Sequence, residues 1–406
     1  MMAAARSEDG ALDDVLSYGV LAERLYAAGQ VSEARATFEE ALACTAAPPE
    51  TPECLRRAYA HVAGSFAMMC EEAGDFAKAE ALYETGLLAY PRCPTCLGNL
   101  PVCLGKRAGD RGLEVVEEAY VRALEEYPVA LPSVMVKYAS FLRRRLNKSD
   151  RAEAVLLGVL DTHPEYADAL AALAVLLHAE RPGDGDRIRH LYERAVRSDP
   201  NNANTLSNFG LFFADVDVDV HAARERYEAA LLVDPNHANA SYNYAVLLDR
   251  HLKDTNAALA MYRRALEAQP DHVYALYNLA VMHEEKLRSP HKALDLYRRA
   301  AAASPHDPVS HAELGRCLAQ LEVDKKHGTP FDFTEADRHL RRALALSSNK
   351  NATALAALGE IALSNGDIPD ANAKLRAALD ADPNNASTKR LAAHLQRTPS
   401  SSSSGN

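Results

Sequence analysis

The stretch from Ala203 to Asp307 decides the fold, because it is one pattern written three times. Its three copies are ANTLSNFGLFFADVDVDVHAARERYEAALLVDPNH (203–237), ANASYNYAVLLDRHLKDTNAALAMYRRALEAQPDH (238–272) and VYALYNLAVMHEEKLRSPHKALDLYRRAAAASPHD (273–307). Marker residues recur every 35 positions: Asn208, Asn243, Asn278; Tyr227, Tyr262, Tyr297; Pro235, Pro270, Pro305. A spacing that holds over three copies indicates a repeat array.

Each copy contains two amphipathic segments with helical periodicity. In the first copy the apolar positions are Leu206, Phe209, Gly210 and Phe213, and then Ala223, Tyr227 and Ala230. The small residues allow two helices to approach closely, and the proline with its Asn or Asp neighbours ends the second helix. Each copy is therefore predicted to be a helical hairpin.

This pattern resembles the tetratricopeptide repeat family, whose units carry Leu, a small residue and an aromatic in the first helix, then Ala, an aromatic, Ala and Pro in the second. The family unit has about 34 residues, so we expect one extra residue in the turn of each copy. The resemblance implies an all-α fold: a right-handed α-solenoid of about ten helix-turn-helix hairpins with a C-terminal capping helix.

Working outward from these copies divides the whole chain. We predict a disordered N-terminus (1–14), irregular Cys-rich hairpins 1–3 (15–130), hairpins 4–8 (131–307), hairpins 9–10 with an insertion near 325–332 (308–384), a capping helix (385–397) and a disordered Ser-rich tail (398–406). Gly98 and Pro101 predict that the first helix of hairpin 3 is bent or short.

Composition limits the function. The net charge of −11 without a basic block argues against nucleic-acid binding. No apolar run reaches the roughly 18 residues that span a bilayer, so membrane insertion is not expected. An acidic N-terminus unlike a targeting peptide and an odd number of cysteines, 7, predict a reducing, cytoplasmic setting.

The chain shows no motif for catalysis. Phosphate loops, nucleophile elbows and HExxH pairs are missing, so we expect no enzyme activity, no catalytic residue and no cofactor. Cys93 and Cys96 form a single CxxC pair, whereas a zinc site needs four ligands, and Cys70 and Cys103 occupy packing positions. No metal site is expected, and a redox role of the pair stays open.

The resemblance implies that first helices line a concave face. Helical spacing then gives three strips: Asn204, Asn208, Leu211, Asp215; Asn239, Asn243, Val246, Arg250; and Tyr274, Asn278, Val281, Glu285, flanked by Tyr242 and Tyr277. Packed helices lie about 8–10 Å apart and an extended peptide advances about 3.3 Å per residue, so one asparagine can meet about every third peptide residue. An asparagine can both donate to and accept from a peptide amide.

The strips are similar to the asparagine ladder of O-linked N-acetylglucosamine transferases and importins. The alternative is that these asparagines only bond neighbouring helices. Chaperone-binding family members clamp a carboxylate with Lys and Arg, which are missing here. Acidic residues favour a neutral or basic partner segment instead: Asp215, Asp249, Glu284, Glu285.

The predicted function is a non-catalytic protein-interaction scaffold or adaptor that binds an extended peptide segment of a partner protein. One alternative is a regulatory or substrate-recruiting subunit of an enzyme complex, for example a glycosyltransferase-like one, with the catalytic part elsewhere. A third interpretation is a self-associating structural element.

Overall fold

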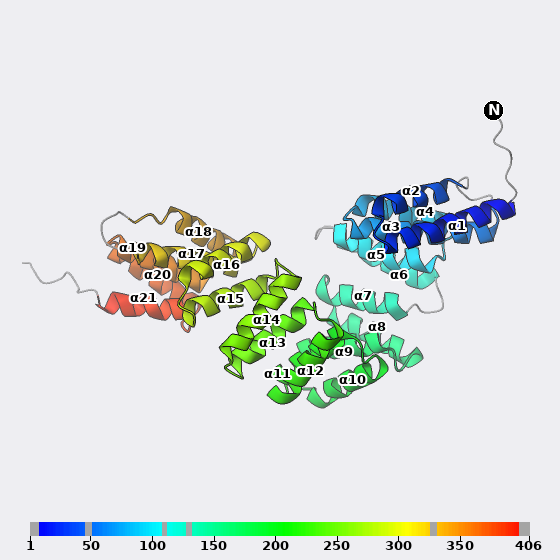
Figure 1. Ribbon diagram of the computed structural model, residues 1–406. Coiled ribbons are helices and arrows are strands. Elements are labelled where there is room, and N and C mark those ends of the chain that lie inside the picture. The colour runs from blue at the N-terminus through cyan, green and yellow to red at the C-terminus, as the bar shows by residue number, and fades with distance from the viewer. Residues whose placement is uncertain (1–7, 45–50, 108–111, 127–131, 325–330, 398–406) are drawn as a thin grey trace, which may run out of the picture. The chain divides into compact units, whose positions relative to one another are not determined.

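The computed structural model describes residues 8–44, 51–107, 112–126, 132–324 and 331–397. Within these ranges the chain forms 21 α-helices and no strand. Consecutive helices pack as hairpins, from α1 with α2 to α19 with α20 (Figure 1). The predicted all-α solenoid of ten hairpins is confirmed. Contacts divide the chain into two compact units, residues 1–200 and 201–406, and the division falls inside the segment predicted as hairpins 4–8.

The first unit contains hairpins 1–5. Its helices are α1 (Glu8–Ala27), α2 (Val31–Ala43), α3 (Glu53–Glu72), α4 (Phe76–Ala89), α5 (Pro94–Arg107), α6 (Leu113–Glu126), α7 (Pro132–Arg144), α8 (Ser149–Thr162), α9 (Ala167–Glu180) and α10 (Gly185–Ser198). In this unit each hairpin also contacts the next, as α4 does α5 and α8 does α9.

The second unit contains hairpins 6–10 and one further helix. Its helices are α11 (Ala203–Asp215), α12 (Val220–Val233), α13 (Ala238–Arg250), α14 (Thr255–Ala268), α15 (Val273–Glu285), α16 (Pro290–Ala303), α17 (Pro308–Val323), α18 (Thr334–Leu346), α19 (Ala352–Ser364), α20 (Ile368–Ala381) and α21 (Ala386–Arg397). The last helix packs on α19 and α20 through the fully buried Leu391. This is the predicted capping helix.

The extra residue of the 35-residue copies lies in the turn, as expected. In hairpin 2 the amide of Asp75 bonds back five residues to Cys70 O after Gly74, whose φ is 79°. In hairpin 6 the amide of Asp219 bonds back six residues to Phe213 O, and Val218 has a φ of 52°. The equivalent residues of hairpins 7 and 8 share this left-handed conformation: Lys253, Arg288. The longer turn therefore leaves both helical faces in register.

Rings on the second helices fill the interior of the hairpins. Tyrosines at one repeat position are fully buried: Tyr83, Tyr192, Tyr227, Tyr262, Tyr297. The facing first-helix residue must be small. A Cβ added to Gly210 would lie 2.8 Å from the ring of Tyr227, and one added to Gly315 would lie 2.6 Å from Leu340 Cγ and 3.0 Å from Ala336 O.

Two predictions about the first unit are wrong. Residues 8–14 are helical rather than disordered, because Leu12, Val15 and Leu16 follow helical spacing and Val15 is fully buried. Of the two features expected for α5, a bent or a short helix, shortening is wrong, because α5 runs over 14 residues despite the internal Pro101. The buried Pro101 loses one backbone bond, but α5 packs on α3, α4 and α6, and this packing offsets the loss. Residues 1–7, 325–330 and 398–406 lie outside the described residues.

An ion-pair network joins hairpins 8 and 9. Arg316 of α17 is buried and donates from both Nη atoms to Glu284 of α15, at 2.8 and 2.5 Å, and from Nε to Glu313 at 2.6 Å. The hydroxyl of Tyr297 donates to Glu284 at 3.3 Å. Burial alone would raise the pKa of Glu284, but the bonds and charge of Arg316 outweigh burial, and the pKa is lowered.

We predict that Gly315→Ala destabilises the protein. The added methyl group has no room against Leu340 and the backbone oxygen of Ala336, and overpacking of this kind costs about 1–3 kcal/mol. The control is Gly158→Ala in α8, where no atom lies within 4 Å of the added Cβ and helix propensity favours alanine by about 1 kcal/mol. Urea unfolding followed by circular dichroism measures both. Equal effects of the two substitutions would contradict the packing argument.

We also predict that Glu284→Gln lowers the free energy of unfolding by about 1–3 kcal/mol near neutral pH, since buried Arg316 loses one of its two charged partners and keeps only Glu313. The folded-state pKa of Glu284 is below the ordinary value of 4.5 for a glutamate. The stabilisation is therefore fully present above this value and is lost as the pH falls through the lower folded-state pKa. Unfolding curves between pH 7 and about pH 2 cover this loss and test it. The control is Glu285→Gln, at the neighbouring, exposed residue. If the difference in free energy of unfolding between the wild type and Glu284→Gln does not change with pH, the assignment is wrong.

Candidate functional site

The predicted polar residues lie on the first helices of hairpins 6–8, within the second unit. Helices α11 and α13 pack side by side. Helices α13 and α15 are joined by Asn278, whose Nδ2 donates to the hydroxyl of Tyr242 at 3.1 Å, and by Lys286, which lies 2.5 Å from Asp249. The three strips are thus neighbours in the order that the sequence predicts.

The outermost asparagines bond the next hairpin. Asn204 Oδ1 lies 3.0 Å from His237 Nε2, and Asn239 Oδ1 lies 3.0 Å from His272 Nε2. The Nδ1 atom of His272 accepts from the amide of Ala275 at 3.2 Å, so Nε2 carries the proton and donates. Burial lowers the pKa of His272 and keeps its ring neutral. The contacts of Asn204 and Asn239 therefore fit the alternative that these asparagines bond neighbouring helices.

The middle asparagines are different. Asn208 and Asn243 are half-buried, and neither side chain bonds any other residue that the structure describes. The side-chain amide nitrogen of Asn278 donates a hydrogen bond to the hydroxyl of Tyr242. Partly buried amides need hydrogen bonds from water or from a ligand. Asn208 and Asn243 thus offer amide groups to a bound chain.

Asn208, Asn243 and Asn278 form a row across α11, α13 and α15, and aromatic rings lie beside this row. The ring of Tyr242 is 5.0 Å from that of His272 and 6.2 Å from that of Tyr274. Tyr274 is 69% exposed. Tyr277 is half-buried against Tyr297, and burial raises the pKa of Tyr277 to about 12. Tyr274 is therefore the ring that a partner can cover, and exposed tyrosines are effective contact residues in interfaces.

The acidic character of this face is smaller than the sequence indicates. Asp249 is paired with Lys286, and Glu284 is paired with Arg316. Asp215 and Glu285 remain exposed. Neither pair can be read from the sequence, because the cations lie 37 and 32 residues away along the chain, on neighbouring hairpins.

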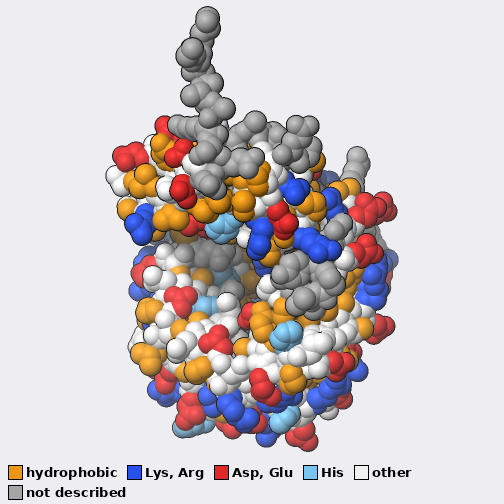
Figure 2. Space-filling model, turned by 90° about the vertical axis from the view of Figure 1, so that its right-hand side faces the viewer, with side chains coloured by type: hydrophobic (Ala, Val, Ile, Leu, Met, Phe, Trp, Pro, Cys, Tyr) orange, Lys and Arg blue, Asp and Glu red, His pale blue; other side chains and the backbone are white. Residues whose placement is uncertain are grey.

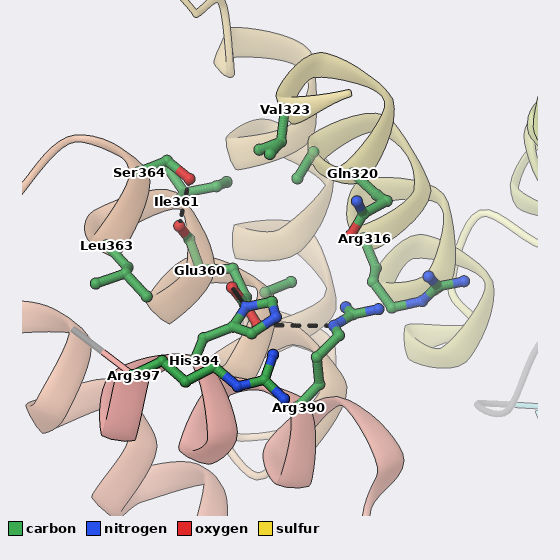
Figure 3. A pocket seen from close by; sticks show the side chains of 12 residues that line it. Arg316, Gln320, Val323, Glu360, Ile361, Leu363, Ser364, Arg390, His394 and Arg397 are labelled. Atoms are coloured by element: carbon green, nitrogen blue, oxygen red, sulfur yellow. Dashed lines mark hydrogen bonds and ion pairs between the residues drawn. The ribbon is translucent and has the colours of Figure 1, made fainter. Parts of the chain in front are cut away.

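A pocket of about 320 Å³ lies at the other end of the same unit, between α17, α19 and α21 (Figure 3). Its apolar lining is Ala319, Val323, Ala357, Ile361 and Leu363. Glu360 lies between His394, whose Nδ1 is 2.8 Å away, and Arg390, whose Nε is 3.6 Å away. The pairs of Glu360 and of Arg316 leave little net charge here. The arrangement suits an uncharged, apolar side chain.

The strips of asparagines do not extend to this pocket. The last of these asparagines lies on α15, whereas Arg316 and Glu360 occupy the corresponding first-helix positions on α17 and α19. The polar lining from Arg390, His394 and Arg397 comes from the capping helix, which no repeat pattern relates to the hairpins.

The surface carries mixed charges. On the face shown in Figure 2, Lys and Arg side chains are interspersed with Asp and Glu. Among the described residues no group of three or more His, Cys, Asp or Glu side chains could hold a metal ion. No helix in the described ranges is both long and apolar enough to cross a membrane.

Comparisons with known proteins agree with this architecture. The sequence profile of the tetratricopeptide repeat family matches residues 142–203, 250–308 and 332–386. No curated protein matches the chain. Among solved structures, the Cut9–Hcn1 hetero-tetramer of the APC/C is similar at 14% identity over 94% of this chain and 89% of that chain, with a TM-score of 0.52.

Two other solved structures are similar over shorter stretches. YrrB, described as a TPR protein with an unusual peptide-binding site, is 22% identical over 50% of this chain and 97% of its own, with a TM-score of 0.40. PilF of Pseudomonas aeruginosa is 18% identical over 65% and 97%, with a TM-score of 0.44. At these identities the likeness concerns the fold alone. Together with the ten hairpins, the three matched segments support the assignment of the chain to the tetratricopeptide repeat family.

Proposed function

We propose that this protein is a non-catalytic interaction scaffold whose second unit binds an extended segment of a partner protein along α11, α13 and α15. The observation that carries the proposal is the pair of half-buried amides of Asn208 and Asn243, which have no partner among the described residues. The family resemblance supports a protein partner in general.

The spacing of the row suits a peptide backbone. Neighbouring first helices at about 8–10 Å place successive amides about three extended residues apart. An asparagine side chain bonds the peptide amide regardless of the peptide side chain, so affinity comes from the backbone. Tyr274 adds an exposed ring beside the row. Specificity for the partner then comes from the side chains that border the row of asparagines.

The exposed carboxylates set the charge of the partner. Glu285 borders the row as an exposed carboxylate, while Asp249 and Glu284 are neutralised by Lys286 and Arg316. A segment with one or two basic residues fits this face better than an acidic one.

We place the protein in a reducing compartment such as the cytoplasm, because its seven cysteines are free thiols.

We predict that Asn208→Ala with Asn243→Ala weakens peptide binding about tenfold or more, since each lost hydrogen bond costs about 0.5–1.5 kcal/mol and 1.4 kcal/mol is tenfold. The probes are peptides selected on the wild-type chain from a displayed library of random sequences and measured by fluorescence polarisation. The control is Asn256→Ala, an exposed asparagine on the second helix α14. Unchanged affinity of the double variant, with an unchanged circular dichroism spectrum, counts against this face.

Glu285→Lys should weaken the binding of Lys- or Arg-containing peptides about two- to fivefold, as expected for an exposed charge, and added salt should reduce the difference. Glu284 is unsuitable for this test because its replacement removes a carboxylate partner of buried Arg316 and so disturbs the fold. The matched control is Glu267→Lys, an exposed residue of α14. If both reversals act equally, the effect is one of net charge and the local assignment is wrong.

A further inference from the structure

Two cysteines meet at the start of α5 in the first unit. The carbonyl of Cys93 accepts the amide of Leu97 at 2.9 Å, so Cys93 stands immediately before the helix and Cys96 lies in its first turn. Both thiols reach the same acceptor: Ala60 O of α3 lies 3.6 Å from Cys93 Sγ and 3.4 Å from Cys96 Sγ. The two sulfurs are therefore neighbours held against one point of hairpin 2.

The second cysteine sits in a space that glycines keep open. Cys96 is fully buried. A Cβ added to Gly86 of α4 would lie 2.7 Å from Cys96 Sγ, and one added to Gly64 of α3 would lie 3.4 Å from it. Most other hairpins have alanine at the position of Gly86, for example Ala195 and Ala230. Hairpin 2 thus accommodates this sulfur specifically.

The first cysteine faces a pocket. Cys93 is 4% exposed and lines a hollow of about 470 Å³ between α1, α3 and the start of α5. The same hollow is lined by Leu12 and Leu16 of α1, by Cys54 and His61 of α3, and by Tyr90. A small thiol reagent entering this pocket meets Cys93 first, and Cys96 lies behind it.

The local bonds favour a thiolate on Cys93. When Cys93 is ionised, a hydrogen bond from the Cys96 thiol, made in place of its bond to Ala60 O, lowers the pKa of Cys93 to about 7 against the opposing effect of burial. The amides of Cys96 and Thr95 at the helix start add to the lowering. The same bond to Cys93, together with burial, raises the pKa of Cys96. The rise and radius of an α-helix place Cα atoms three positions apart at about 5 Å, within the Cα–Cα range of about 4.4–6.8 Å that disulfides span.

We propose that Cys93 and Cys96 form a reversible thiol–disulfide site, in which Cys93 attacks a small disulfide such as oxidised glutathione and Cys96 resolves the adduct. The Cys93 thiolate attacks one glutathione sulfur, forms a mixed disulfide and releases one glutathione thiolate. The Cys96 thiol loses its proton and attacks Cys93 Sγ, which forms the Cys93–Cys96 disulfide and releases the second glutathione. Two protein thiols are oxidised, and one glutathione disulfide is reduced to two thiols.

This site goes beyond scaffold function and does not depend on it. Oxidation removes the two S–H donors from Ala60 O, which are direct polar links between hairpins 2 and 3. The exchange would therefore report the redox state at a contact inside the first unit.

The test uses the purified full chain in mixtures of oxidised and reduced glutathione, followed by alkylation, trypsin digestion and tandem mass spectrometry. Cleavage after Arg92 and Lys106 yields one peptide that holds Cys93, Cys96 and Cys103. We expect a Cys93–Cys96 disulfide with Cys103 alkylated, formed in proportion to oxidised glutathione and reversed by dithiothreitol.

Variants separate the two roles. Cys96→Ser should accumulate glutathione on Cys93 severalfold above wild type, and Cys93→Ser should abolish the internal disulfide. Cys54→Ser, which removes the exposed thiol of the same pocket, should leave the pair unchanged. The wild-type map needs no variant to fold. Absence of the Cys93–Cys96 disulfide in oxidised glutathione, or glutathione on Cys54 in place of Cys93 in Cys96→Ser, would overturn the proposal.

Discussion

The packing of a second-helix ring or branched side chain against a small first-helix residue is the contact on which the structure depends. Tyr227 fills the space that Gly210 leaves, and Leu340 fills the space beside Gly315. A single hairpin cannot cover its own apolar faces, so each one gains stability by stacking on the next. The extra turn residue in hairpins 6–8 is tolerated because it changes only the connection, at Val218 and its equivalents, and not this contact.

Stacking also sorts the polar residues of the first helices. Asn204 and Asn239 are drawn into bonds with the histidines that begin the next hairpin, and Glu284 becomes the partner of Arg316. Asn208 and Asn243 sit between these links with their amides unpaired among the described residues. A repeated polar residue can thus have two roles in one array, and the neighbours of each copy decide which role it takes.

The first unit uses the same geometry for different chemistry. Where other hairpins have alanine, Gly86 makes room for the sulfur of Cys96, and the start of α5 brings Cys93 beside it at the edge of a pocket. In the other hairpins this close packing stabilises the array. At the start of α5 it also places two thiols side by side. A reactive pair can therefore arise without departing from the fold.

The sequence alone determined the hairpins, the longer turns, the capping helix and the strips on α11, α13 and α15, because helical periodicity and turn chemistry are local. It missed the start of α1 and the full length of α5, where packing of Val15 and around Pro101 overrides acidic residues and a proline. Tertiary structure decided which strip residues are free, where the pocket beside Glu360 lies, and that Cys93 and Cys96 share one acceptor. These features join side chains about 30 or more residues apart, and their partners are set by how one hairpin stacks on the next, which no local pattern records.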